Sequence, residues 1–246
     1  MTLRIGILVI HNDPVPEVEV WSSVRPGTSV HTARFWTPRA FGTEFTGRDL
    51  DSLFGDTGLD IAVRQLGELG VHALGYCFTS ASVFGGIAFD AAFAERAEKL
   101  AGGIPVITAG QALREALVDS EAEDIAVVAP PWFSDATLDA LRSYLPVTVR
   151  QIIRFELPPV WEGIDRPDLF DRGARHAVEA AELERQVLEA LEPEVGTLLV
   201  PGSGFASLAA AERLRRSCGL QTISANTALV QALEKRLPQE AAIQVP

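Results

Sequence analysis

The chain of 246 residues has little cysteine: Cys77 and Cys218 are its only two, and they form no C-x-x-C pair. Two thiols are too few for a disulfide framework, and their spacing excludes a cysteine-based structural zinc site. The four histidines are scattered without metal-ligand spacing. We therefore expect no metal site.

Long apolar runs are also missing. No run approaches the roughly 20 residues of a membrane helix. The opening residues carry one short apolar run and then His, Asn, Asp and Pro, whereas a secretory signal needs a longer run and a cleavage site of small residues. The expectation is a cytoplasmic protein that begins with a buried strand and has no membrane partner.

Basic residues are scarce relative to acidic ones. Lysine and arginine total 21 against 33 aspartates and glutamates, for a net charge of −12. Such a surface repels phosphate backbones and anionic lipid, which argues against nucleic acid as a partner. A small anionic substrate stays compatible with a locally favourable site. The sequence leaves the oligomeric state open, a homo-oligomer included.

Two familiar catalytic motifs are absent as well. No G-x-G-x-x-G follows the first apolar run, which argues against a nicotinamide enzyme. The PGSGFAS segment does not have the G-x-S-x-G spacing of a nucleophile elbow, so a serine hydrolase is disfavoured.

What the chain does contain is an internal repeat. Residues 105–117 read PVITAGQALREAL and residues 221–233 read QTISANTALVQAL, with six identical positions at the same offset. Upstream of each copy an apolar run ends in small and hydroxyl residues, FTSAS at 78–82 and GSGFAS at 202–207. Self-similarity at a wide offset predicts two related halves, whose strand ends can face one cleft that holds a small ligand.

Strand-like and helix-like patterns alternate along the chain. Apolar runs without clean alternation predict buried parallel strands, at 5–10, 72–77, 105–108, 125–129, 147–153, 197–200 and 221–224. Helical periodicity falls at 59–69, 88–100, 111–118, 134–144, 169–191, 207–216 and 228–236. Segments 14–16 and 158–167 are rich in proline and are expected to be loops.

The fold class is therefore α/β. We expect two pseudo-symmetric three-layer halves, each a mostly parallel sheet flanked by helices, with a cleft between them. The repeat suggests that residues 1–112 plus 227–246 form the first half and residues 113–226 the second. Ser134 and Asn226 each precede a helical pattern and are expected to cap it.

The two duplicated turns are the leading candidates for ligand binding. Thr79, Ser80 and Ser203 offer hydroxyl and backbone donors to an anion at strand-to-helix turns. Helix capping alone would explain one such turn, but its recurrence in the second half favours a paired carboxylate or enolate site.

Other polar residues have two interpretations each. Cys77 precedes the first turn and is either a nucleophile or proton donor or, more often for such a residue, a buried strand cysteine. Asn12 and His11 follow the first strand, where they either bind a carboxylate and relay a proton or serve the turn before Pro14. Trp132 either lines the cleft or packs in the core.

The ordered motifs resemble the aspartate/glutamate racemase superfamily, especially its maleate isomerase and arylmalonate decarboxylase branch. The similar segments are RIGILVI with the Asn12 loop, TSAS, IPVITAGQAL, IAVVAPPW, LLVPGSGF and TISANTAL, which together span most of the chain. The resemblance implies two pseudo-symmetric α/β halves and cofactor-free chemistry on a small carboxylate or dicarboxylate through an enolate-like intermediate.

The resemblance also implies site residues. In the family one or two cysteines transfer protons, but Phe78 and Gly202 stand at those positions here, and Cys77 is one residue early, which reverses the direction of a strand side chain. Trp132 stands where the decarboxylases have a donor tyrosine. The expected catalytic residues are Cys77, His11 and Ser203, and the expected substrate-binding residues are Asn12, Thr79, Ser80, Trp132, Gly202, Gly204 and Asn226.

Three functions remain at this point. The first is a decarboxylase or an isomerase of the racemase type, with atypical proton-transfer residues. The second is a homologue that binds a small carboxylate and has lost catalysis, motivated by the absence of both cysteines. The third is different chemistry in the same cleft, such as hydration or hydrolysis.

Overall fold

The computed structural model describes residues 3–238, and the strands in this range form two four-stranded sheets with only parallel pairings. The first sheet has the order β2-β1-β3-β4 and the second the order β6-β5-β7-β8, so the second repeats the topology of the first. The strands are β1 (Leu3–Ile10), β2 (Thr28–Phe35), β3 (Ala73–Tyr76), β4 (Val106–Thr108), β5 (Asp124–Ala129), β6 (Thr148–Arg154), β7 (Thr197–Val200) and β8 (Gln221–Ser224). The expected α/β class with two related sheets is confirmed.

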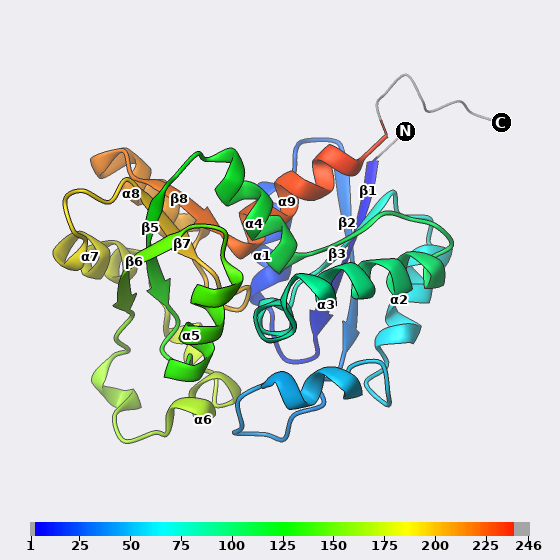
Figure 1. The fold of residues 1–246 in the computed structure, drawn as a ribbon, viewed down its shortest axis with the longest axis horizontal. Coiled ribbons are helices and arrows are strands. Elements are labelled where there is room, and N and C mark those ends of the chain that lie inside the picture. The colour runs from blue at the N-terminus through cyan, green and yellow to red at the C-terminus, as the bar shows by residue number, and fades with distance from the viewer. Residues whose placement is uncertain (1–2, 239–246) are drawn as a thin grey trace.

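Helices cover both sheets. They are α1 (Val15–Ser23), α2 (Leu59–Glu68), α3 (Thr79–Leu100), α4 (Ala109–Asp119), α5 (Asp135–Tyr144), α6 (Arg166–Asp171), α7 (Ala180–Ala190), α8 (Leu208–Cys218) and α9 (Ala225–Arg236). In Figure 1 the first sheet with α2 and α3 lies on the right, and the second with α7 and α8 lies on the left. Within the described range no helix combines the length and apolarity of a transmembrane span.

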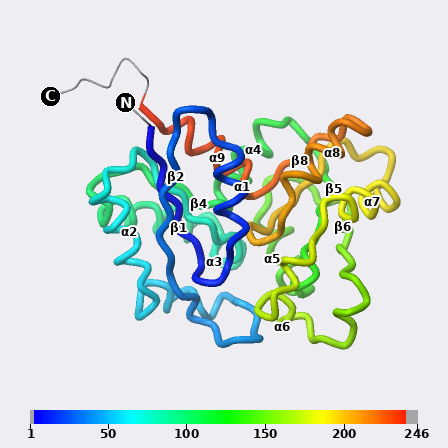
Figure 2. The backbone as a smooth tube through the Cα atoms, turned by 180° about the vertical axis from the view of Figure 1, so that it is seen from behind, coloured from blue at the N-terminus to red at the C-terminus, as the bar shows by residue number. Residues whose placement is uncertain are grey.

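The repeated segments form the junction between the sheets. Each copy is a short strand followed by a capped helix: Thr108 accepts from Gln111 N–H at the start of α4, and Ser224 accepts from Thr227 N–H at the start of α9. Helices α4 and α9 pack on each other, and both views place them between the two sheets (Figures 1 and 2).

Helix α9 also reaches the first sheet, where it contacts β3 and β4. The approach is close, because a Cβ on Gly75 would lie 3.0 Å from Leu233 and 3.1 Å from Leu229. The proposed domain boundaries stay a prediction, and residues 1–2 and 239–246 of the expected first half lie outside the described residues.

Several elements differ from the sequence expectations. Strand β2 and helix α1 were not predicted, and α3 starts at Thr79 rather than at 88, continuing past a non-helical Gly86. The single helix expected at 169–191 is divided into α6, a 3₁₀ turn at Ala174–Ala177 and α7. Ser134 caps α5 as expected, but Ser224 rather than Asn226 caps α9.

Candidate active site

A pocket lies where the carboxyl ends of the two sheets meet. The inner strands β1 and β3 of the first sheet and β5 and β7 of the second all end at it. Its volume is about 70 Å³. Polar groups line it at Asp13, Arg39, Thr43, Glu44, Thr79, Ser80 and Ser203, and apolar side chains at Ile10, Phe45, Phe78, Trp132, Phe133, Pro167 and Phe170. Two glycines, Gly202 and Gly204, complete the lining.

The first donor turn opens α3. Phe78 is the residue before the helix, and Thr79 and Ser80 are its first two residues, so the backbone N–H groups of Thr79 and Ser80 lie at the pocket without intrahelical partners. A helix N-terminus favours an anion, because its N–H dipoles point outward. Thr79 and Ser80 line this pocket, and their expected role in binding a substrate stays a prediction.

The second donor turn follows β7 and contributes Gly202, Ser203 and Gly204. The Ser203 hydroxyl donates to the Cys77 carbonyl at 3.1 Å, so its proton is engaged in a bond between the two halves. Asn226 does not line the pocket. Its Nδ2 donates to the Ser203 carbonyl at 2.9 Å and to Glu19 at 2.7 Å, which makes Asn226 a positioning residue for this turn.

Cys77 is not at the pocket. Its side chain has no exposed surface and packs in the core cluster that contains Ile107 and Leu229. Burial first, and then the negative charges of Asp13 and Glu17, raise the pKa of the thiol far above its ordinary value. A thiol needs its ionised form to act as a nucleophile or base. The structure therefore gives no support to the expected catalytic role of Cys77.

His11 is likewise outside the pocket. Its ring stacks on Trp36 with centroids 4.0 Å apart. Burial lowers its pKa, and the nearby arginines, Arg39 first, lower it further against the opposing charge of Asp171. Asn12 donates to Asp171 at 3.1 Å and does not line the pocket. The structure thus assigns Asn12 a role in holding a loop.

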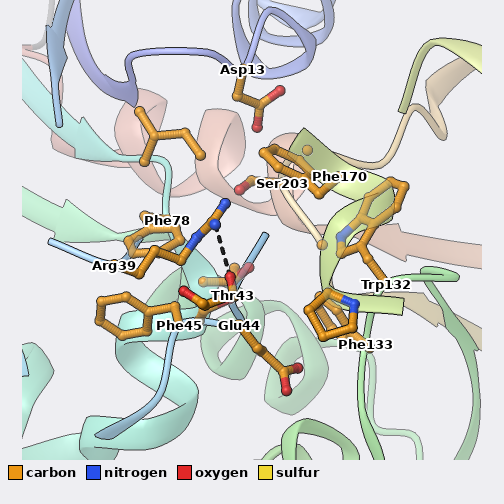
Figure 3. Close-up of a pocket in the computed structure, with 16 residues that line it drawn as sticks. Asp13, Arg39, Thr43, Glu44, Phe45, Phe78, Trp132, Phe133, Phe170 and Ser203 are labelled. Atoms are coloured by element: carbon orange, nitrogen blue, oxygen red, sulfur yellow. Dashed lines mark hydrogen bonds between the residues drawn. The ribbon is translucent and has the colours of Figure 1, made fainter. Parts of the chain in front are cut away.

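A buried carboxylate was missed from the sequence. Asp13 is 1% exposed, lines the pocket, and has Oδ1 bonded to the Val15 N–H at 3.0 Å. Its other oxygen, Oδ2, lies so near the second donor turn that a Cβ on Gly204 would be 2.5 Å from it. Figure 3 shows the carboxylate directed toward Ser203.

The environment of Asp13 tunes its proton affinity. Burial raises its pKa from 3.8 to about 6, assisted by the charge of Glu19 and opposed by the Val15 N–H, Arg175 and Arg34. A carboxylate with a pKa near the working pH can both accept and return a proton. Asp13 therefore has the properties of a general acid–base group at the pocket.

The outer wall of the pocket is held by an ion pair between the two halves, Arg39–Asp171, which we call the clasp. Arg39 donates to both carboxylate oxygens of Asp171 at 2.6 and 2.8 Å, and Gly42 N–H and Asn12 add further bonds. Burial alone would raise the pKa of Asp171, but the hydrogen bonds from Arg39 and Gly42 hold it below its ordinary value. Glu44 makes a second link, accepting from Ser134 N–H and the Thr137 hydroxyl.

Sequence reasoning had few signals for these groups. Asp13 stands beside Pro14, where turn chemistry alone accounts for an aspartate. Arg39 and Asp171 are 132 positions apart and share no motif. In the described part of the chain no three His, Cys, Asp or Glu side chains are placed to hold a metal ion.

Comparison with known proteins identifies the family. The family model for arylmalonate decarboxylase matches residues 56–244, which is more than half of the chain. The chain therefore belongs to the arylmalonate decarboxylase family. Among curated proteins no sequence matches.

Solved structures share the fold. The maleate isomerase Iso from Pseudomonas putida S16 matches with a TM-score of 0.77 and 18% identity, over 95% of this chain and 92% of that one. An arylmalonate decarboxylase matches with a TM-score of 0.70 and 18% identity, over 94% and 91%. A Nocardia farcinica maleate cis-trans isomerase mutant, holding a covalently bound succinylcysteine intermediate, matches at 0.74 and 19%, over 95% and 92%.

Proposed function

We propose that the chain is a cofactor-independent enzyme that forms an enolate-like intermediate from a small carboxylic acid, with Asp13 as the proton-transfer group. The observation that carries the proposal is the buried Asp13 carboxylate in the same pocket as the N-terminus of α3. The Asp13 carboxylate can take a proton from carbon or return it, and the N–H groups at the start of α3 can stabilise the negative charge that develops on oxygen.

The donors at Thr79 and Ser80 would hold one substrate carboxylate, which gains charge as its neighbouring carbon loses a proton, or loses a second carboxyl group as CO₂. Removing one such donor typically lowers a rate by roughly 10²–10³. The relative with a succinylcysteine carries a cysteine that reacts covalently. The described pocket of this chain is lined by no cysteine, so a thiol-dependent route is not supported.

The number of proton-transfer groups narrows the reaction class. Racemisation with inversion needs two groups on opposite faces of the carbon. Asp13 is the one pocket group with a pKa raised toward neutrality among the described residues, whereas Phe78 stands at the family cysteine position of the first half. This favours a one-base reaction, namely decarboxylation followed by protonation, or a proton-shift isomerisation.

Deuterium incorporation from D₂O tests this proposal. Small carboxylic acids are incubated with the protein, and ¹H NMR follows deuterium entering at the carbon next to the carboxylate, or loss of the acid. We expect incorporation or decarboxylation with the wild type and a decrease of roughly 10²–10⁴ with Asp13→Asn. Cys77→Ala serves as the control and should retain turnover.

The alternative of a carboxylate-binding protein without catalysis predicts a different outcome. It predicts binding of acids with no deuterium entry and no consumption at any pH between 5 and 9. Undiminished turnover in Asp13→Asn would instead show that another group moves the proton.

A further inference from the structure

A second buried carboxylate, Asp90, lies behind the donor turn of α3. Its side chain is 3% exposed and does not line the pocket. Three buried hydroxyls donate to it: those of Ser82 and Thr108 to Oδ1 at 2.6 and 2.7 Å, and that of Tyr144 to Oδ2 at 2.6 Å. Asp90 can therefore influence a reaction in the pocket only through these bonds.

The bond from Ser82 spans a break in α3. Gly86 interrupts the helix with φ of 70° and ψ of −171°, a conformation that glycine adopts far more readily than other residues. Such a residue removes the regular geometry that would fix one end of a helix relative to the other. Ser82 lies before the break, one helical turn after Thr79, and Asp90 lies after it. The bond between them thus ties the start of α3 to the rest of the helix.

The other two bonds hold Asp90 from neighbouring helices. Thr108 is the N-cap of α4, and Tyr144 is the last residue of α5, which follows β5 of the second sheet. Helix α3 contacts both α4 and α5 (Figure 1). Asp90 therefore receives its position from two other helices and passes it to Ser82.

Close packing leaves Ser82 little room to move. A Cβ on Gly110, in the first turn of α4, would lie 2.2 Å from the Ser82 Cβ and 2.7 Å from the Tyr144 hydroxyl oxygen. The backbone of α4 is thus in direct contact with these groups. Ser82 is held by a hydrogen bond on one side and by a helix backbone on the other.

Alignment is what the donor turn needs for catalysis. Donors that face a developing charge act only when they are aimed at it, and a misplacement of about 1 Å can lower a rate roughly 10²-fold. We propose that Asp90 is a positioning residue that, through Ser82, fixes Thr79 and Ser80 in the geometry that the reaction requires. The inference rests on the proposed function and adds to it a group that lies outside the pocket.

Two hydroxyl deletions on the same carboxylate test this inference. Ser82→Ala and Tyr144→Phe each remove one donor to Asp90 and should lower the thermal midpoint by similar amounts. Deuterium entry and acid consumption are followed with methylmalonate, phenylmalonate and maleate, at a temperature where both variants are folded. Ser82→Ala should lower kcat at least about tenfold and change KM less than about threefold, because misaligned donors lose most where charge develops.

Tyr144→Phe is the matched control. Its kcat should stay within about threefold of the wild type, because Oδ1 of Asp90 keeps its bonds to Ser82 and Thr108. Hydrogen exchange at 79–85 should be faster in Ser82→Ala than in Tyr144→Phe.

Replacements of Asp90 itself separate position from charge. Asp90→Asn keeps an oxygen for the Ser82 and Thr108 hydroxyls, so its kcat should stay within about fivefold of the wild type even if its thermal midpoint falls. Asp90→Ala leaves Ser82 without its acceptor and should match the loss of kcat in Ser82→Ala. If Asp90→Ala does not fold, the comparison of Ser82→Ala with Tyr144→Phe still decides.

Three results with an active wild type would overturn the inference and leave the proposed function in place. They are an unchanged kcat in Ser82→Ala, an equal loss of kcat in Tyr144→Phe, and a loss in Asp90→Asn as large as that in Asp90→Ala. A wild type that neither incorporates deuterium into any of these acids nor consumes one rejects the proposed function, and this inference with it.

Discussion

Burial of Asp13 makes the folded protein less stable at neutral pH than it would be with a neutral side chain. The folded-state pKa of about 6 lies above the ordinary 3.8, so the folded state binds the proton more tightly. The penalty is absent below about pH 4, grows as the pH rises, and is complete above about pH 6. Asp13→Asn should therefore raise the free energy of unfolding by about 1–3 kcal/mol at pH 7.5 and change it little at pH 4.

Urea denaturation of both proteins at the two pH values measures this difference. If Asp13→Asn raises the free energy of unfolding equally at both pH values, the burial of a charged carboxylate is not the cause of the difference. A gain in stability together with a loss of turnover would mark Asp13 as a group kept for function at the expense of stability.

Gly204 is the residue whose size decides whether Asp13 keeps its place. A Cβ there would lie 2.5 Å from Asp13 Oδ2 and 2.8 Å from Phe170. Gly204→Ala should displace the Asp13 carboxylate and reduce turnover at least about tenfold. Overpacking should also lower the free energy of unfolding by about 1–3 kcal/mol. Gly196→Ala is the matched control, because a Cβ there meets nothing within 4 Å. Steady-state turnover rates of the two variants are compared. Equal rates would reject the idea that the small size of Gly204 keeps Asp13 in position.

At the residue scale the sequence predicted part of the pocket lining, and the roles of those residues stay predictions. The duplicated turns led to Thr79, Ser80 and the 202–204 segment, all of which line the pocket. Cys77 was chosen for its reactivity, but alternation along the chain turns its side chain into the core. Asp13 carried no local signal, because its raised pKa arises from burial that only the folded chain produces.

Among the elements, the loop at 36–46 and helix α6 depend on one buried ion pair. Side chains of Arg39 and Asp171 are 10% and 2% exposed. Breaking such a pair leaves an uncompensated charge and typically costs about 3 kcal/mol or more. Asp171→Asn should therefore speed hydrogen exchange in 36–46, and a double-mutant cycle with Arg39→Met should show strong coupling.

The exposed pair Arg142–Asp139 on α5 provides the control for that cycle. Its side chains are 49% and 74% exposed, and its coupling should be about 0.3–0.5 kcal/mol. Similar coupling energies in the two cycles would show that the Arg39–Asp171 pair does not hold the outer wall of the pocket. Unchanged hydrogen exchange at 36–46 in Asp171→Asn would show the same.

The elements that sequence patterns missed have a common physical character. Strand β2 lies at the sheet edge and, among residues 3–238, pairs with β1 alone, so its TSVHTARF sequence alternates in burial and lacks the continuous apolar run of an inner strand. Helix α1 begins beside Pro14 and includes Pro16, but proline is tolerated in a first helical turn. Short continuous apolar runs, by contrast, predicted the inner strands to within a residue or two.

At the scale of the whole molecule, the repeat explains why the site lies between the sheets. Each copy continues from an edge strand, β4 or β8, into a junction helix, and the two helices pack on each other. This arrangement directs the ends of β1 and β3 and the ends of β5 and β7 at one pocket. Sequence similarity within the chain could predict the pairing of halves, but not the polar contacts that fix their distance.

Glu19 on α1 provides one polar contact of this kind. It is 5% exposed and accepts from the N–H groups of Ser207 and Leu208 at the start of α8, and from Asn226 at the start of α9. One carboxylate of the first half therefore caps a helix of the second half and orients Asn226, which in turn holds the Ser203 carbonyl.

Glu19→Gln should weaken both the junction and the pocket. The amide keeps one acceptor oxygen but turns an N–H₂ group toward the Asn226 or Ser207 donors, which leaves a buried donor unsatisfied. We expect a loss of about 2–3 kcal/mol in unfolding free energy and faster hydrogen exchange at 202–208. Glu17→Gln, on the same helix but paired with Arg34 near the surface, should change stability by less than about 1 kcal/mol. Equal effects of the two substitutions would show that Glu19 does not contribute to holding the halves together.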